Sequence, residues 1–291
     1  MRSVILAAFV LIASLAICCA LGGMIGGGLA RADGEENGGV GVREATTTAN
    51  AVEAKLPCPS DMQLVDGMFC PQVQQICLYD VDSKGNKMGP HKIGGRCGMF
   101  QAPSVCLSKT RIHKRYCVDT FEIPNVVGEL PQSWMSWYDV KAFCESKNKR
   151  MMTASEFVFA CEGEQMLPYP YKTGYVRDRT SCDTDRDEPN FDRFKDNKTL
   201  RYMDRLLFSI GSNPDCVSPF GIRDLVGSID EFVINETGHP YKSAMVGGHA
   251  LGVRNRCRTS ADEPGSEGTT AHNEWFSFWE SGGRCAKNAS F

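Results

Sequence analysis

The sequence predicts a disulfide-stapled α+β domain in which ordered loops take up much of the chain. Two helix starts lie between Ser133 and Gly163, and each is followed by an amphipathic segment. Beyond Gly163 the chain is rich in Pro, Gly, Asp and Asn, with only short apolar stretches, which favours long ordered loops over a few strands. Loops of this kind need fastening, and the cysteines distributed along the chain can provide it.

Both helix starts carry a capping box, in which a hydroxyl and an acidic residue three positions later satisfy free backbone donors. The two pairs are Ser136 with Asp139 and Thr153 with Glu156. Behind each cap, apolar residues at i, i+3 and i+4 define one buried face. These residues are Val140, Phe143 and Cys144 in the first helix and Phe157, Ala160 and Cys161 in the second. Each buried face therefore carries a cysteine.

The N-terminus has the composition of a secretory signal. Arg2 precedes an apolar run from Val4 to about Leu21, and a Gly-rich stretch then ends in an A-x-A site at Ala32. We predict that residues 1–32 are a cleaved signal peptide and that the protein is secreted, periplasmic or in the cell envelope. An uncleaved anchor is the alternative, because the apolar run approaches the roughly 18 residues that span a bilayer.

The cysteine count is consistent with export. Cys18 and Cys19 would leave with the signal, so 12 of the 14 cysteines remain in a chain that enters an oxidising compartment. We therefore expect disulfides. A zinc site needs short spacings such as C-x2-C, and the six cysteines between residues 58 and 117 are too far apart for that pattern. Spacing alone does not choose among the possible pairings.

The rest of the N-terminal half divides into two parts. Residues 33–55 are polar, rich in Gly and Thr and without an apolar period, which predicts a disordered linker. Residues 56–125 combine six cysteines with turn signals, and we interpret them as a Cys-rich, loop-rich N-terminal part of the domain, or alternatively as a separate stapled module. The net charge of −3 is spread without a basic block, which excludes nucleic acid as an expected partner.

Six segments between Ser133 and Ala286 follow one family pattern. Residues 136–163 match a V-S-W-x-x-A-x-x-Y-C helix followed by K-R-L-P-T-E-x-E-W-E-x-A, and residues 218–232 match N-x-F-G-L-Y-D-M-x-G-N-V-W-E-W. The shorter matches are Pro168-Tyr169-Pro170-Tyr171 with Y-P-W-G, Gly247-Gly248 with R-G-G, Arg256-Cys257-Arg258 with C-R, and Gly283-Arg284-Cys285 with G-F-R-C. In order and spacing, this set resembles the formylglycine-generating, or sulfatase-modifying factor, family.

This resemblance implies a fold and two disulfides. Residues 126–291 are expected to form a sulfatase-modifying-factor-like domain with the family's C-type-lectin-like α+β fold. Carried over from the family, the structural disulfides would join Cys144 to Cys285 and Cys161 to Cys257, which ties both helices to the end of the chain.

The family's oxidation chemistry has no counterpart in this sequence. The resemblance implies a pair of cysteines that binds copper(I) shortly before the C-R segment, because two soft thiolates suit that ion. Here the stretch between Gly248 and Cys257 reads HALGVRNR and contains no cysteine. His249 supplies one imidazole, and a lone histidine is a poor replacement for two thiolates. We therefore assign no catalytic residue and do not expect copper.

Calcium is the second cofactor that the resemblance implies, held by backbone carbonyls and a few carboxylates or amides. Glu231 occupies the position of the family's ligand glutamate. The other expected ligands are the carbonyls of Val226, Gly227 and Ile229 and, at a second site, Asn190 and Phe191. This sequence departs from the pattern at Ser228 and Asp230, where the family has Asn and Trp. The alternative is that Glu231 only caps the loop or forms a salt bridge.

We interpret the protein as a family member that binds a protein, peptide or glycan partner through variable loops. The alternative is a formylglycine-type oxidase, or another oxygen-dependent copper or iron enzyme that acts on exported proteins. Residues 272–276 could line a groove for a partner. We expect instead that the aromatic residues around them fill the core beside Cys285; these are Trp275, Phe276, Phe278 and Trp279.

Overall fold

The computed structural model of the chain describes residues 56–92, 95–186, 206–252, 255–258 and 272–290. These residues belong to a unit that runs from Glu53 to Phe291. The predicted signal peptide and linker, residues 1–55, lie outside the described residues. None of the helices in the described part is both long enough and apolar enough to cross a membrane.

The two predicted helices are present as α1 (Trp137–Ser146) and α2 (Ala154–Glu162). Both begin with the predicted capping box: the hydroxyls of Ser136 and Thr153 each accept a backbone N–H three residues later, at 3.2 Å. The helix α2 ends at Gly163, whose φ of 64° lies in the left-handed region that favours glycine.

Each helix buries the predicted face. Val140 and Cys144 of α1 are fully buried, and Phe143 packs half-buried beside them. The helix α2 is more deeply enclosed, and four of its apolar side chains have no exposed surface: Phe157, Phe159, Ala160 and Cys161. The two buried cysteines therefore point into the core, where a distant part of the chain can reach them.

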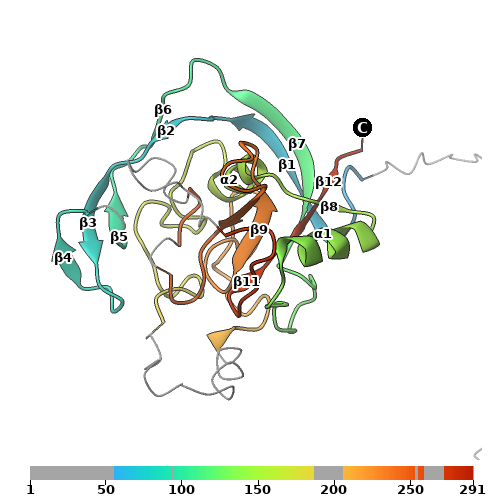
Figure 1. Cartoon of the computed structure of the whole chain (residues 1–291). Coiled ribbons are helices and arrows are strands. Elements are labelled where there is room, and N and C mark those ends of the chain that lie inside the picture. The colour runs from blue at the N-terminus through green and yellow to red at the C-terminus, as the bar shows by residue number, and fades with distance from the viewer. Residues whose placement is uncertain (1–55, 93–94, 187–205, 253–254, 259–271, 291) are drawn as a thin grey trace, which may run out of the picture. The chain divides into compact units, whose positions relative to one another are not determined.

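The main sheet joins the beginning of the domain to its end. Its strands are antiparallel, in the order β1 (Met62–Phe69), β7 (Ile112–Asp119), β12 (Cys285–Asn288) and β8 (Arg150–Met151). Figure 1 shows the long strands β1 and β7 curving around one side of the molecule. Because β7 pairs with β12, the Cys-rich N-terminal part shares a sheet with the last strand of the chain.

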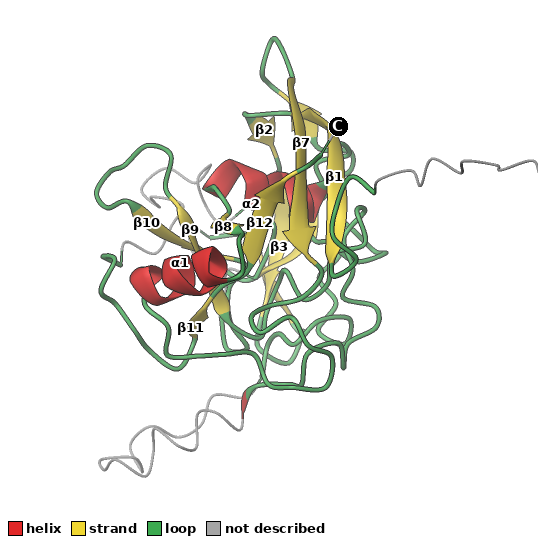
Figure 2. Cartoon of the chain, turned by 90° about the vertical axis from the view of Figure 1, so that its right-hand side faces the viewer, coloured by secondary structure: helices red, strands yellow, loops and turns green. Residues whose placement is uncertain are grey.

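A second sheet lies beside α1 (Figure 2) and includes the end of the segment 218–232 that resembles the family pattern. Its central strand β9 (Asp230–Ile234) pairs antiparallel with β10 (Ser243–Val246) and parallel with β11 (Ser281–Gly282). Every residue of β10 and β11 is buried, as are the first four residues of β9. A strand that is covered on both faces can place side chains in two separate environments.

Two small sheets complete the Cys-rich part. On the side of the molecule opposite α1 (Figure 1), one has the strand order β4-β3-β5, and the other pairs β2 with β6. Their bounds are β2 Val73–Gln74, β3 Cys77–Val81, β4 Lys87–Gly89, β5 Cys97–Phe100 and β6 Val105–Cys106. Long ordered loops follow α2, as predicted: within the described residues between Gly163 and Ile229, no α-helix or extended strand forms.

Six disulfides staple this framework. Cys144 is bonded to Cys285 and Cys161 to Cys257, which are the two pairs that the family resemblance implies. The sequence had left the other pairings open, and the structure joins Cys58 to Cys117, Cys70 to Cys106, Cys77 to Cys97 and Cys182 to Cys216. All twelve cysteines after residue 55 are therefore paired.

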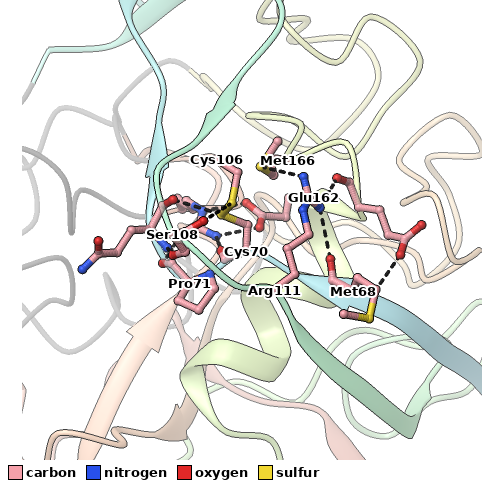
Figure 3. Close-up of a disulfide and its surroundings, with 11 residues drawn as sticks. Met68, Cys70, Pro71, Cys106, Ser108, Arg111, Glu162 and Met166 are labelled. Carbon is pink, nitrogen blue, oxygen red and sulfur yellow. Dashed lines mark hydrogen bonds and ion pairs between the residues drawn. A yellow bond between two sulfur atoms is a disulfide. The ribbon is translucent and has the colours of Figure 1, made fainter.

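The Cys70–Cys106 disulfide lies against the end of α2 (Figure 3). Both carboxylate oxygens of the fully buried Glu162 accept hydrogen bonds from Arg258 at 2.7 Å, and Arg258 also donates to the carbonyl of Cys70. Arg111 donates to the backbone carbonyl of Met68 in β1 and to that of Glu164, just after α2. Charge-assisted hydrogen bonds thus fix the Cys-rich part to the helical part of the core.

Candidate functional site

Three family segments meet at the start of β9. Asp230 lies opposite Ser281 in the parallel pairing with β11, and Glu231 lies opposite Val246 at the end of β10. The chain then turns through Gly247 and Gly248, both at positive φ. A Cβ atom at Gly248 would lie 2.1 Å from the Oδ1 of Asn255, so only glycine allows this approach. The turn places His249 directly beside the strand.

Glu231 forms a fully buried ion pair with Arg284. The Nε and Nη2 atoms of Arg284 donate to the carboxylate at 2.8–3.0 Å, and its Nη1 donates to the carbonyls of Asp119 and Thr120. Burial raises the pKa of Glu231, and the positive charge of Arg284 opposes that rise. The structure thus gives Glu231 the salt-bridge role that the sequence left as an alternative to calcium binding.

Other buried acids surround this pair. Burial raises the pKa of Glu122 well above its usual range, and the negative charges of Asp224 and Glu231 raise it further. Burial likewise raises the pKa of Asp183 to about 6, although Arg186 opposes the shift. Three buried carboxylate oxygens here have no hydrogen-bond partner among the described residues: Glu122 Oε1, Asp183 Oδ2 and Asp224 Oδ1. Such a region attracts a cation.

The predicted calcium ligands of the first site lie together in the loop that leads into β9. Val226, Gly227, Ile229 and Glu231 are all buried, and a Cβ atom at Gly227 would lie 2.2 Å from the carbonyl oxygen of Asp183. The excess of buried acidic oxygen fits calcium, which prefers oxygen ligands. A calcium ion bound to Glu231 would share that carboxylate with Arg284. The predicted second site, Asn190 and Phe191, lies outside the described residues.

On the other side of β9, three side chains converge that the sequence did not connect. The carboxylates of Asp230 and Glu280 and the imidazole of His249 place ligand atoms that all lie within 4.8 Å of one another. The His249 Nε2 atom is 3.5 Å from Glu280 Oε2, and the ring of Trp279 packs edge-on against His249 with 5.3 Å between centroids. In the sequence, His249 is a lone histidine and Asp230 departs from the family pattern, so neither was predicted to be a metal ligand here. No spacing signal connects three residues from three segments.

Residues 109–289 match a family described as the sulfatase-modifying factor enzyme 1-like domain. The chain belongs to this family. The solved structures that match this chain include PvdO from Pseudomonas aeruginosa (13% identity, TM-score 0.43) and CarF (11% identity, TM-score 0.46). The matches cover 78% and 80% of this chain and 94% and 99% of those proteins, respectively. No match was found among curated proteins.

This sulfatase-modifying-factor-like domain has its cysteines committed to disulfides. The stretch from His249 to Arg256 contains no cysteine, and the next cysteine, Cys257, is bonded to Cys161. Within the described part of the chain, no cysteine is left with a free thiol. Copper(I) oxidation needs two thiolates, and these residues do not supply them. The C-type-lectin-like geometry that the resemblance implied stays a prediction.

The aromatic segment before β11 divides between core and surface. Phe276 is half-buried against the core cluster that contains Cys285, as predicted. Trp279 is buried too, but in a separate cluster with Ile229. The prediction is wrong for Trp275 and Phe278, which are 74% and 38% exposed; the loop carries the Trp275 ring outward onto α1. There it lies 4.4 Å from the ring of Tyr138, which is 40% exposed, and Phe278 is also exposed nearby in sequence. We call Tyr138 and Trp275 the aromatic surface.

Proposed function

We propose that this chain is an exported member of the sulfatase-modifying factor family that binds a partner and does not oxidise thiols. The pairing of all twelve cysteines after residue 55 carries the proposal, because it leaves no thiolate pair for copper(I). A framework with six staples also tolerates variation in its loops without losing its shape.

The aromatic surface supports partner binding. Tyrosine and tryptophan are enriched in binding interfaces because each presents a large, rigid apolar area together with a polar tip. A tryptophan as exposed as Trp275 has no core role that would account for its position. The partner is expected to be a protein, a peptide or a glycan, contacted through Trp275 and Tyr138.

Export is supported by the disulfides. Six disulfides in one unit are typical of proteins that fold in an oxidising compartment, and the predicted signal peptide provides the route. We therefore propose a secreted, periplasmic or cell-envelope location. Calcium is proposed as a structural cofactor at the loop from Val226 to Glu231, where it would balance the buried acids.

The absence of oxidation can be tested directly. The purified protein is incubated with copper(I), oxygen and a peptide that carries a sulfatase-type cysteine motif, and the peptide mass is followed. We expect the cysteine to remain unchanged. Conversion of that cysteine to the aldehyde would overturn this part of the proposal.

Partner binding needs a matched comparison. Wild-type protein, Trp275→Ala and Met88→Ala are applied to arrays of glycans and peptides and to envelope and matrix proteins. Met88 is 71% exposed and lies on β4, on the opposite side of the molecule from α1 (Figure 1). We expect a specific signal that Trp275→Ala removes and Met88→Ala keeps. No specific signal for the wild-type protein, or equal loss in both variants, would contradict the proposal.

A further inference from the structure

We propose that Asp230, His249 and Glu280 form a binding site for one first-row divalent transition-metal ion of the zinc type. Asp230 follows the proposed calcium ligand Ile229 in sequence, but its side chain lies on the face of β9 opposite Glu231. The proposal does not depend on the proposed partner binding. It uses one imidazole nitrogen and two carboxylate oxygens, which together offer a dication two negative charges and a borderline-soft ligand.

The distances are close to what such an ion requires. Ligand atoms around a tetrahedral zinc ion lie about 3.3 Å apart when each bond is about 2.0–2.1 Å long. His249 Nε2 and Glu280 Oε2 are already 3.5 Å apart, and all three ligand atoms fall within 4.8 Å. The side chain of Glu280 is 18% exposed, so rotation about its side-chain bonds can close the remaining gap.

Two features of the fold hold the ligands in place. Asp230 begins the central strand β9, and successive residues of a strand point to opposite faces, so it is directed away from the pair formed by Glu231 and Arg284. The edge of Trp279 packs on the ring of His249 and limits its rotation. A site that is positioned by packing loses less conformational entropy when the ion binds.

A second cluster of possible metal ligands lies in the Cys-rich part, but it can offer fewer ligands than the cluster beside β9. Cys77, Asp80 and His91 also converge, but Cys77 is bonded to Cys97 and has no thiolate to offer. Only two ligands remain there, and the Nδ1 of His91 lies 2.7 Å from Asp80 Oδ1. The pair is therefore a matched control: a half-buried histidine beside an aspartate, with no third ligand among the described residues.

The choice of ion follows from the ligands. Calcium prefers oxygen and gains little from an imidazole, whereas zinc, iron and cobalt accept nitrogen and oxygen together. Three protein ligands leave a fourth position open to water or to an oxygen of a bound molecule. The same metal class could serve binding or catalysis, and the proposal concerns occupancy of the site alone.

The test is a titration of the whole domain with zinc. Protein dialysed against a chelator is titrated with zinc chloride in a calorimeter, with millimolar calcium present to fill oxygen-only sites. We expect about one equivalent of zinc to bind, and His249→Gln and Glu280→Gln each to weaken binding at least about tenfold. His91→Gln should bind as the wild type does. Circular dichroism and a thermal melt check that each variant is folded, and Glu280→Gln gives the same readout if His249→Gln fails to fold.

Three results of the titration would contradict the proposed zinc site. Absence of saturable zinc binding to the wild-type protein overturns the site, and so does equal affinity in wild type, His249→Gln and Glu280→Gln. Weakening by His91→Gln alone would move the binding to the Cys-rich part and also overturn the proposal. None of these results depends on whether a partner of the aromatic surface is found.

Discussion

Arg284 and Glu231 connect the main sheet to the β10-β9-β11 sheet through a buried ion pair. Glu231 lies on β9, and Arg284 immediately precedes β12 of the main sheet, with donor to acceptor distances of 2.8–3.0 Å. The side chains are 0% and 1% exposed. Removing one charge would leave the other buried and uncompensated, which is costlier than removing the pair.

Glu231→Gln should therefore destabilise the domain strongly. We expect the free energy of unfolding to fall by about 3–5 kcal/mol, measured by urea denaturation under non-reducing conditions. Lys141→Met is the control, because Lys141 and Glu145 form an exposed i,i+4 pair and the change should cost less than about 0.5 kcal/mol. Equal losses in the two variants would contradict the buried role of Glu231.

The disulfides should differ in what their removal costs. Cys144 and Cys285 are separated by 141 positions and are fully buried, whereas Cys77 and Cys97 are separated by 20. By chain entropy, the long crosslink contributes about 5 kcal/mol and the short one about 3 kcal/mol. We expect the double alanine variant of the long pair to lose more stability in urea denaturation. The opposite order would mean that residual structure in the unfolded chain outweighs loop length.

Alanine substitution of the buried Trp279 should lower the free energy of unfolding far more than substitution of the exposed Trp275. Trp279→Ala leaves a cavity in the core and should lower the free energy of unfolding by about 3–5 kcal/mol. Trp275→Ala removes an exposed ring that packs at a tilt against Tyr138 and should cost less than about 1.5 kcal/mol. Thermal melts followed by circular dichroism measure both. A large loss in Trp275→Ala would assign that residue to the core instead of to binding.

Calcium should stabilise the folded domain if the loop from Val226 to Glu231 binds it. At a free calcium concentration of about 100 times the dissociation constant, the gain is about 2.7 kcal/mol. The midpoint of thermal unfolding is compared in calcium, in magnesium and in a chelator, and we expect only calcium to raise it, because magnesium demands a stricter geometry. An unchanged midpoint across millimolar calcium would refute a site in that concentration range.

Part of the candidate site could be predicted from the sequence, because its residues lie in segments that match the family pattern. Glu231, Arg284 and the two glycines lie in segments that match the family motif by motif, and the structure brings these segments together around β9. The cluster of Asp230, His249 and Glu280 was not accessible, because Asp230 departs from that pattern and His249 and Glu280 lie outside the matched segments. Their proximity depends on the parallel pairing of β9 with β11 and on the turn at Gly247.

The sequence by itself determined the local features of this protein and its family. A capping box involves residues three positions apart, so Ser136 with Asp139 and Thr153 with Glu156 define the helix starts without help from the rest of the chain. Only the tertiary structure decided how eight of the cysteines pair, that Trp275 lies outside while Trp279 lies inside, and that three ligand-type side chains meet beside β9. The physical reason is that contacts between distant segments depend on the whole path of the chain, which the disulfides and the sheets set together.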